Sequence, residues 1–411
     1  MKAKNILHKA AAAAAAAIMC MSAIAPSVNV YAQNYTPVHD DKAQQMEKYL
    51  IMKQDANVPQ TTFTFTADGN LSPITGTADT MPVKPGSMAS GTPVIGTATF
   101  TPTTPTFTSP QPLISDLGGD TTGRNDNVTL NADEKYARAT VDVDFRNVSF
   151  SEPGVYRWKI SETIPTGQSI TADDTDGKYL DVYVEDNNGQ LAVTGYVLHN
   201  DNGPVKKDGT HLNSNTKDGG FSNHYSTQNL TFGKQVTGNQ GSKDKYFKFH
   251  LKIEGALPST VYTVDVSDAD ASISANPNMA TTVITSTVNN ATSLTAGNTG
   301  SVEAAFYLQH DQSILVKGLP KGATYTVTEN KEDYVSTDGA TYTRGSSQIT
   351  ANGATSGTIG TADVATGFTN SNNGIVPTGY FSIPGILVIG AALAGFGIRE
   401  ILKKKKRAIA E

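Results

Sequence analysis

The sequence predicts an all-β protein with two tandem β-sandwich domains between two terminal segments of different character. Short runs of alternating apolar and polar residues recur along the chain, separated by Gly, Asn, Asp and Pro, which is typical of strands and turns. Long helical periods are absent between the two ends, and one ordered set of residues occurs twice. We expect the domains at residues 33–226 and 227–374, with a Thr/Pro/Gly-rich insertion at 67–122 in the first.

The first 32 residues have the composition of a secretory signal peptide. Lys2, Lys4 and Lys9 precede an Ala-rich apolar stretch, and Val30-Tyr31-Ala32 fits a cleavage site with small residues. The apolar stretch is short for a membrane span. We therefore expect export and a mature chain that begins at Gln33.

The C-terminus carries three features in a fixed order. A motif at 375–379 is followed by a hydrophobic span at 380–402 and a basic tail at 403–411. A lone transmembrane anchor would explain the last two features, but not the Pro-Thr-Gly directly before them. The whole resembles a cell-wall sorting signal, in which a sortase cysteine attacks the Thr-Gly bond and an amine resolves the acyl-enzyme. The motif residues are Ile375, Val376, Pro377, Thr378 and Gly379.

Composition excludes several classes of site. The single cysteine, Cys20, lies in the predicted signal, so the mature chain has no disulfide, cysteine nucleophile or thiolate metal site. The net charge is −6, and removing both ends removes mainly Lys and Arg, so the mature surface is more acidic still. This charge argues against nucleic acid as a partner.

A diverged repeat places Lys early, Glu late and Asn at the end of each predicted domain. The second copy contains Leu230 to Lys234, Tyr325 to Glu329 and Phe368 to Asn370. The first copy contains Ile51 to Lys53, Tyr156 to Glu162 and Phe221 to Asn223, with Lys53 fitting the strand alternation least well.

Strand alternation places each polar member of the repeat on an apolar, inward face. Side chains two residues apart share a face, so Lys234 follows Leu230 and Phe232, and Glu329 follows Tyr325 and Val327. Burial lowers the pKa of Lys and raises that of Glu. A neutral Lys amine could then attack the Asn side chain, expel ammonia and form an isopeptide bond without a cofactor, with Glu moving the proton. The alternative is a structural salt bridge.

With these motifs, the chain resembles two-domain major pilins of the T-antigen type, which are built from CnaB-like Ig-fold domains. The resemblance covers most of residues 45–379. It implies one self-formed Lys–Asn bond per domain, promoted by Glu. The implied residues are Lys53, Glu162 and Asn223 in the first domain, and Lys234, Glu329 and Asn370 in the second.

The resemblance also implies an acceptor lysine shortly before the last strand of the first domain. Lys217 has this position, one residue closer to Asn223 than the family pattern, and Lys206 and Lys207 remain alternatives. Subunits would then join head to tail, Thr378 of one to the lysine of the next.

The expected function is that of a major pilin subunit in a cell-wall-anchored pilus outside a Gram-positive cell. Its partners would be a pilin-class sortase, copies of itself, accessory pilins and peptidoglycan, with host surface ligands left open. The alternatives are a wall-anchored adhesin or minor tip pilin that is not polymerised, and a displayed enzyme. An enzyme is disfavoured because the His residues are scattered and no His-x-x-x-His, Gly-x-Ser-x-Gly or metal-binding pattern occurs.

Overall fold

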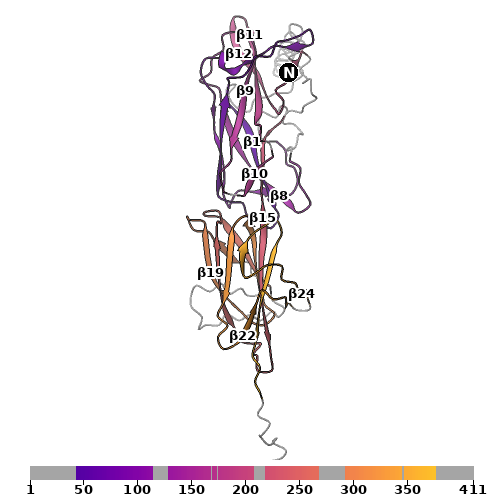
Figure 1. The fold of residues 1–411 in the computed structure, drawn as a ribbon. Coiled ribbons are helices and arrows are strands. Elements are labelled where there is room, and N and C mark those ends of the chain that lie inside the picture. Colours follow the sequence, from indigo (N-terminus) through magenta and orange to yellow (C-terminus); the bar gives the residue numbers. More distant parts are fainter. Residues whose placement is uncertain are drawn as a thin grey trace, which may run out of the picture.

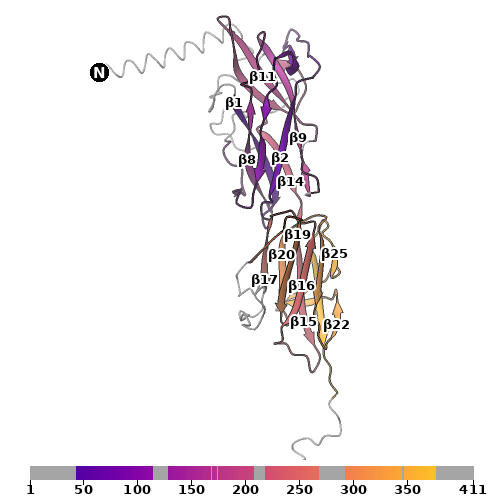
Figure 2. The same cartoon turned by 90° about the vertical axis from the view of Figure 1, so that its left-hand side faces the viewer.

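The computed structural model shows two β-sandwiches stacked end to end (Figures 1 and 2). It describes residues 43–113, 128–167, 169–173, 175–207, 218–267, 292–344 and 347–375. These residues form strands and one short 3-10 turn, Gly86–Met88, so the all-β prediction is confirmed. None of their elements is a helix long and apolar enough to span a membrane. The predicted signal peptide and hydrophobic span lie outside the described residues.

The first sandwich is built from strands β1 to β14. One sheet has the order β10-β14-β1-β8-β5, with β7 also on β8, and the facing sheet has the order β12-β11-β9-β2-β6, with β4 on β9. β3 and β13 form a separate pair. The strands are β1 Ala43–Lys53, β2 Thr61–Asp68, β3 Thr80–Met81, β4 Val83–Pro85, β5 Val94–Ile95, β6 Thr97–Phe100, β7 Thr106–Phe107, β8 Glu134–Asp144, β9 Gly154–Thr163, β10 Ile170–Ala172, β11 Lys178–Asn187, β12 Gln190–His199, β13 Val205–Lys206 and β14 Gly220–Tyr225.

The second sandwich follows after a single residue, Ser226. Its sheets have the orders β18-β17-β20-β15-β26-β22 and β19-β16-β21-β25, and β23 pairs with β24. The strands are β15 Thr227–Thr237, β16 Phe247–Glu254, β17 Val261–Ser267, β18 Thr292–Thr295, β19 Ser301–Leu308, β20 Ser313–Pro320, β21 Thr324–Glu329, β22 Val335–Asp338, β23 Tyr342–Arg344, β24 Ser347–Ile349, β25 Ser356–Thr358 and β26 Val364–Ser371.

In both domains the first strand pairs in parallel with the last. β1 pairs with β14, and β15 pairs with β26. Each pair lies inside its sheet, between two further strands, so the two ends of each domain are brought side by side in its core. This topology places residues that are far apart in the sequence within side-chain reach.

The predicted insertion contributes strands β4 to β7 to the two sheets, and its residues Val83 and Phe107, with residues from elsewhere in the domain, cover the outer faces of the first sandwich. Phe107, Val128 and Leu130 pack on Tyr49 and neighbouring residues of the β1 sheet, outside the main core. On the opposite sheet, Val83 and Val205 belong to a second small cluster with residues of β9, β11 and β12. β1 is therefore buried on both faces.

Candidate self-crosslinking centres

The second domain brings Lys234, Glu329 and Asn370 together between its two sheets. Lys234 Nζ lies 2.7 Å from Glu329 Oε1, and Asn370 Nδ2 donates a hydrogen bond to the same oxygen at 2.9 Å. The side chains of Lys234 and Glu329 are 0% and 2% exposed, and Asn370 is fully buried. Lys234 and Asn370 come from the parallel pair β15 and β26, whereas Glu329 comes from β21 in the facing sheet.

Burial sets the electrostatics of this centre. Loss of water lowers the pKa of Lys234 to about 8, although its contacts with Glu329 act in the opposite direction. Burial likewise raises the pKa of Glu329, against the effect of Lys234. A shift of this size raises the neutral fraction of the amine at pH 7 roughly 300-fold, to about one tenth. The neutral amine and the protonated acid are the forms that the reaction requires.

The first domain has an equivalent buried Lys–Glu pair, with Lys48 as its lysine. Lys48 Nζ lies 2.9 Å from Glu162 Oε1, and the two side chains are 0% and 4% exposed. Burial lowers the pKa of Lys48 to about 8, again against the effect of Glu162. Asn223 is fully buried on β14, and its side chain makes no hydrogen bond within the described part of the chain.

Lys53, the lysine that we expected from the sequence, is not at this centre. Its Nζ donates a hydrogen bond to Gln228 Oε1 at 2.7 Å and lies 3.8 Å from Asp363, both in the second domain. Its side chain is 32% exposed. The prediction failed because both faces of β1 are buried, so apolar neighbours do not show which face lies in the main core. The odd-numbered residues, including Lys53, point toward the insertion. The even-numbered residues, including Lys48, point toward the opposite sheet. Lys48, and not Lys53, is therefore the lysine that lies beside Glu162.

Strand register shows that the two centres are equivalent. In the first domain Lys48 pairs with Phe221, and the residue two places later pairs with Asn223. In the second domain Lys234 pairs with Phe368, and the residue two places later pairs with Asn370. The lysine thus has the same offset from the asparagine in both parallel pairs.

Two aromatic residues complete the repeat and were not predicted from the sequence. Lys48 Nζ lies 4.6 Å from the centroid of the Phe63 ring, and Lys234 Nζ lies 4.3 Å from that of Phe247. In the first domain this ring lies two residues before Phe65, which pairs with the glutamate across the sheet. In the second domain it lies two residues before Phe249, which pairs with the other glutamate. The shared spacing in the segments Phe63-Thr64-Phe65 and Phe247-Lys248-Phe249 was the available signal. These rings help exclude water from the amines.

The chemistry open to each centre is attack of a neutral amine on a carboxamide. In the second domain the Lys amine, the Glu carboxyl group and the Asn side chain are in contact in a dry core, as proximity catalysis requires. In the first domain the strand register places the buried Asn223 on the strand beside Lys48. In the second domain the Asn nitrogen, which would leave as ammonia, already contacts Glu329. Among the described residues no group of His, Asp and Glu could hold a metal ion.

The predicted sortase motif and the candidate linking lysines are only partly within the described residues. Ile375 is the last described residue and is 91% exposed, whereas Val376, Pro377, Thr378, Gly379 and Lys217 lie outside the described residues. Lys206 is half-buried in β13, and Lys207 is exposed directly after it.

Both ends of the connection between β12 and β14 meet at one buried ammonium group. Lys178 Nζ donates to Asn200 Oδ1 at 2.9 Å and also to Asp218, the residue that follows Lys217. Arg157 adds a contact to the first end, because its guanidinium donates to the Gly203 carbonyl at 2.8 Å. The points where this connection leaves and rejoins the sandwich are therefore fixed.

The fold and the two centres define a protein with a buried Lys–Glu–Asn group in each of two tandem β-sandwiches. Residues 44–226 match the family model described as a Spy0128-like isopeptide containing domain. Residues 228–372 match a model described as a domain of unknown function (DUF7601). The chain resembles a Gram-positive backbone pilin, so the resemblance inferred from the sequence is confirmed.

The chain is also similar to individual proteins. A curated protein named pilin, from Streptococcus pyogenes serotype M1, is 25% identical over 278 residues, which are 62% of this chain and 70% of that protein. Similar solved structures include the major pilin from Streptococcus pyogenes, with 19% identity, a TM-score of 0.45 and coverage of 82% of this chain and 100% of the other. The T-13 major pilin of the same species has 22% identity, a TM-score of 0.40 and coverage of 81% and 98%.

Proposed function

We propose that this chain is a structural pilus subunit that crosslinks each of its domains by a self-formed Lys–Asn isopeptide bond. The observation that carries the proposal is the repetition of one buried centre, Lys48–Glu162–Asn223 and Lys234–Glu329–Asn370, in one strand register. Two salt bridges of independent origin would have no reason to share register, burial and an asparagine.

In each centre the neutral lysine Nζ attacks the asparagine Cγ. The new Nζ–Cγ bond forms, the Cγ–Nδ2 bond breaks, and the proton that the lysine loses passes through the glutamate carboxyl group to the departing nitrogen. Ammonia leaves, so the chain becomes about 17 Da lighter for each bond. The reaction occurs once per centre, consistent with a structural protein rather than an enzyme.

We further propose that subunits are polymerised by sortase. The enzyme would cut between Thr378 and Gly379, and a lysine of the next subunit would resolve the acyl-enzyme. Lys217 is the leading acceptor because it precedes Asp218, whose position Lys178 fixes, and Lys206 and Lys207 are the alternatives. The subunit would act outside the cell, with accessory pilins and peptidoglycan as further partners.

The intact mass of recombinant residues 33–378, purified without sortase, tests the crosslinks. We expect a mass about 34 Da below that calculated from the sequence, two ammonias. Lys48→Ala and Lys234→Ala should each show a deficit of about 17 Da against their own calculated masses. Lys53→Ala is the matched control and should keep both bonds. An unshifted mass for the parent chain would refute self-crosslinking.

Replacement of the candidate lysines by arginine tests polymerisation. Arginine keeps the charge but is not a substrate amine at neutral pH. With a pilin-class sortase, the parent chain should give a ladder of high-mass species, and Lys217→Arg should abolish it. A ladder that survives the combined replacement of Lys217, Lys206 and Lys207 would refute linkage through these lysines, and a parent chain that forms no ladder would favour a wall-anchored adhesin or tip subunit that is not polymerised.

A further inference from the structure

The strand that carries Lys234 loses one of its two neighbouring strands beside the crosslinking centre. β20 begins at Ser313, which pairs with Gly233, whereas β15 continues to Thr237. From Lys234 onward, this side of β15 meets the turn between β19 and β20 instead of a strand. Lys234 itself donates its backbone N–H to the Gln312 carbonyl in this turn at 2.9 Å.

Two residues past Lys234, an imidazole takes the place of a strand carbonyl. Val236 donates its backbone N–H to Nδ1 of His310 at 3.0 Å. On the other side of β15, Val236 pairs with Asn370 of β26. His310 therefore holds β15 at the residue opposite the asparagine that the amine of Lys234 must reach.

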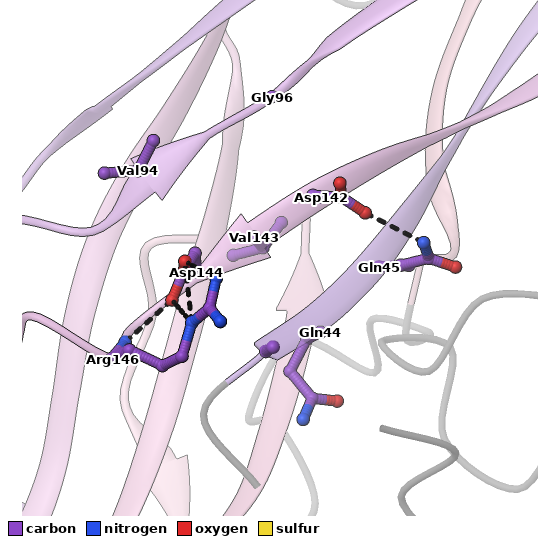
Figure 3. Close-up of a pocket in the computed structure, with 9 residues that line it drawn as sticks. Gln44, Gln45, Val94, Gly96, Asp142, Val143, Asp144 and Arg146 are labelled. Carbon is purple, nitrogen blue, oxygen red and sulfur yellow. Dashed lines mark hydrogen bonds and ion pairs between the residues drawn. The ribbon is translucent and has the colours of Figure 1, made fainter. Parts of the chain in front are cut away.

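In the first domain a regular strand holds the corresponding position. β1 is paired with β8 over its whole length. Figure 3 shows the start of this pair, beside a surface pocket, where Gln45 Nε2 donates to Asp142 Oδ1 at 2.8 Å. Leu50, the residue opposite Asn223, pairs with Ala137 of β8. The backbone of a strand does not titrate, whereas an imidazole does.

The tautomer of His310 follows from its two neighbours. A backbone N–H only donates, so Nδ1 must accept from Val236 with its lone pair. Nε2 then carries the proton and lies 3.3 Å from Asp311 Oδ2. The other oxygen of Asp311 accepts from Thr343 Oγ1 at 2.8 Å, which holds the carboxylate in place. The side chain of His310 is 11% exposed, so only the neutral imidazole can make its contact with Val236 without water as a substitute.

The charged groups that act on His310 within the described residues are Asp311, Lys243 and Lys234. Asp311 lies in the same turn, and Lys234 lies on β15. Lys243 follows β15, and its carbonyl accepts from the His310 backbone N–H at 3.4 Å. Burial, against the effect of Asp311 and with that of the two lysines, lowers the pKa of His310 below its usual 6.5. The imidazole is therefore neutral at neutral pH and gains a proton only in acid.

We propose that His310 is a positioning residue for the second crosslink, and that its protonation releases Val236 and slows formation of this bond in acid. The inference rests on the proposed function. A protonated Nδ1 turns a second donor toward the Val236 N–H, which leaves a buried donor without its acceptor. β15 is then held less firmly opposite Asn370, so amine and carboxamide meet less often in register. The new charge itself favours the neutral form of Lys234, so slower bonding reports a loss of position.

The rate of the second bond, in a reporter chain that cannot form the first, tests this role. The reporter is residues 33–378 with Asn223→Ala, recovered from inclusion bodies in urea and checked by intact mass to lack any bond. Dilution into buffer starts the reaction, and loss of about 17 Da is followed with time.

The decisive comparison is with His310→Gln in the same reporter. The amide oxygen of glutamine can accept from Val236 and does not titrate. Titration of Lys234 and Glu329 is common to both chains, so it cancels in the ratio of their rates. The reporter rate divided by the His310→Gln rate should fall at least about threefold between pH 7.5 and pH 5.

Two further variants control for structure and for histidine content. His310→Leu removes the acceptor, so it should react more slowly than His310→Gln at neutral pH and show no extra loss in acid. His250→Gln replaces a histidine of the same domain that is 49% exposed on β16, and it should keep the pH dependence of the reporter. A rate ratio that is constant with pH, or a His310→Leu chain as fast as His310→Gln, would overturn the inference while the second bond stands. A reporter that never loses ammonia would instead refute the second crosslink itself, and the role of His310 with it.

Discussion

At the residue scale, each centre stores an unfavourable charge state that the reaction removes. Lys234 and Lys48 are buried, and each faces a single carboxylate, so burial lowers the pKa of both amines to about 8. A buried charged pair costs free energy that its mutual attraction only partly offsets. Conversion of the amine into a neutral amide ends this cost. The burial that activates each lysine therefore also favours the product.

A variant that cannot crosslink should reveal this stored cost through its pH dependence. In Asn370→Ala, Lys234 keeps a folded pKa of about 8 against an unfolded value near 10.5. Above pH 10.5 the amine is neutral in both states. As the pH falls to 8, only the unfolded state takes up the proton, so unfolding becomes easier by up to about 3 kcal/mol. The second domain should thus become more stable from pH 8 to 10.5, measured by urea unfolding with circular dichroism.

The control for this experiment is the double variant Lys234→Met, Asn370→Ala, which has no buried amine in the second domain. Its stability should change less over the same pH range. Equal slopes for the single and double variants would mean that Lys234 is not desolvated in the folded state.

Sequence patterning named five of the six residues of the two proposed centres, and it named Lys53 where the structure places Lys48 beside Glu162 for a physical reason. Alternation separates an inner from an outer face only where one face meets water. β1 is covered on both faces, so Tyr49 and Ile51 beside Lys53 were as apolar as Met46 and Leu50 beside Lys48. One difference was available: Lys48 has apolar residues two places away on both sides, as Lys234 has, whereas Lys53 is followed by Asp55.

At the element scale, the parallel pairing of first and last strands is what brings Lys to Asn. The strands themselves follow from local alternation, but their pairing joins residues more than 100 positions apart and has no local signal. In the first domain the close approach of β14 to β1 depends on Gly220. A Cβ atom at this position would lie only 1.7 Å from the Glu47 carbonyl oxygen. Glycine here lets the two backbones pair in the register that places Asn223 beside Lys48.

Gly220→Ala should therefore impair the first crosslink selectively. The added methyl group pushes β14 away from β1, so Asn223 no longer meets Lys48 in the productive register. We expect most molecules to lack one ammonia rather than two by intact mass, with the remaining bond in the second domain. Gly195→Ala is the control, because a Cβ atom at Gly195 in β12 meets nothing within 4 Å. A full deficit of two ammonias in Gly220→Ala would show that β14 tolerates the shift.

At the scale of the whole molecule, residues of the two proposed crosslinks and the domain junction lie along one continuous path. β14 carries Asn223 and continues through Ser226 into β15, which carries Lys234. Lys234 faces Asn370 on β26, the strand that leads to the C-terminal motif. In the proposed fibre, tension would pass along these strands and across the second bond without unfolding either sandwich. The composition of the strands predicted two sandwiches. It did not predict the contacts between the two sandwiches, because these involve turn residues, and polar character alone does not show that a turn residue lies at a domain junction.

The junction itself should behave as a stiff element that depends on Asn57. Its Nδ2 donates to the Val261 carbonyl at 2.8 Å and to Thr263 Oγ1 at 3.0 Å, across the two domains. Asn57→Ala removes both hydrogen bonds and should weaken the junction by about 1–3 kcal/mol. Small-angle X-ray scattering should then show a wider distribution of domain orientations, while both crosslinks still form. Asn187 is exposed at the end of β11, so Asn187→Ala is the control and should give the same scattering as the parent chain. Unchanged scattering for Asn57→Ala would show that the remaining contacts, including Lys53 with Gln228, are enough to hold the rod straight.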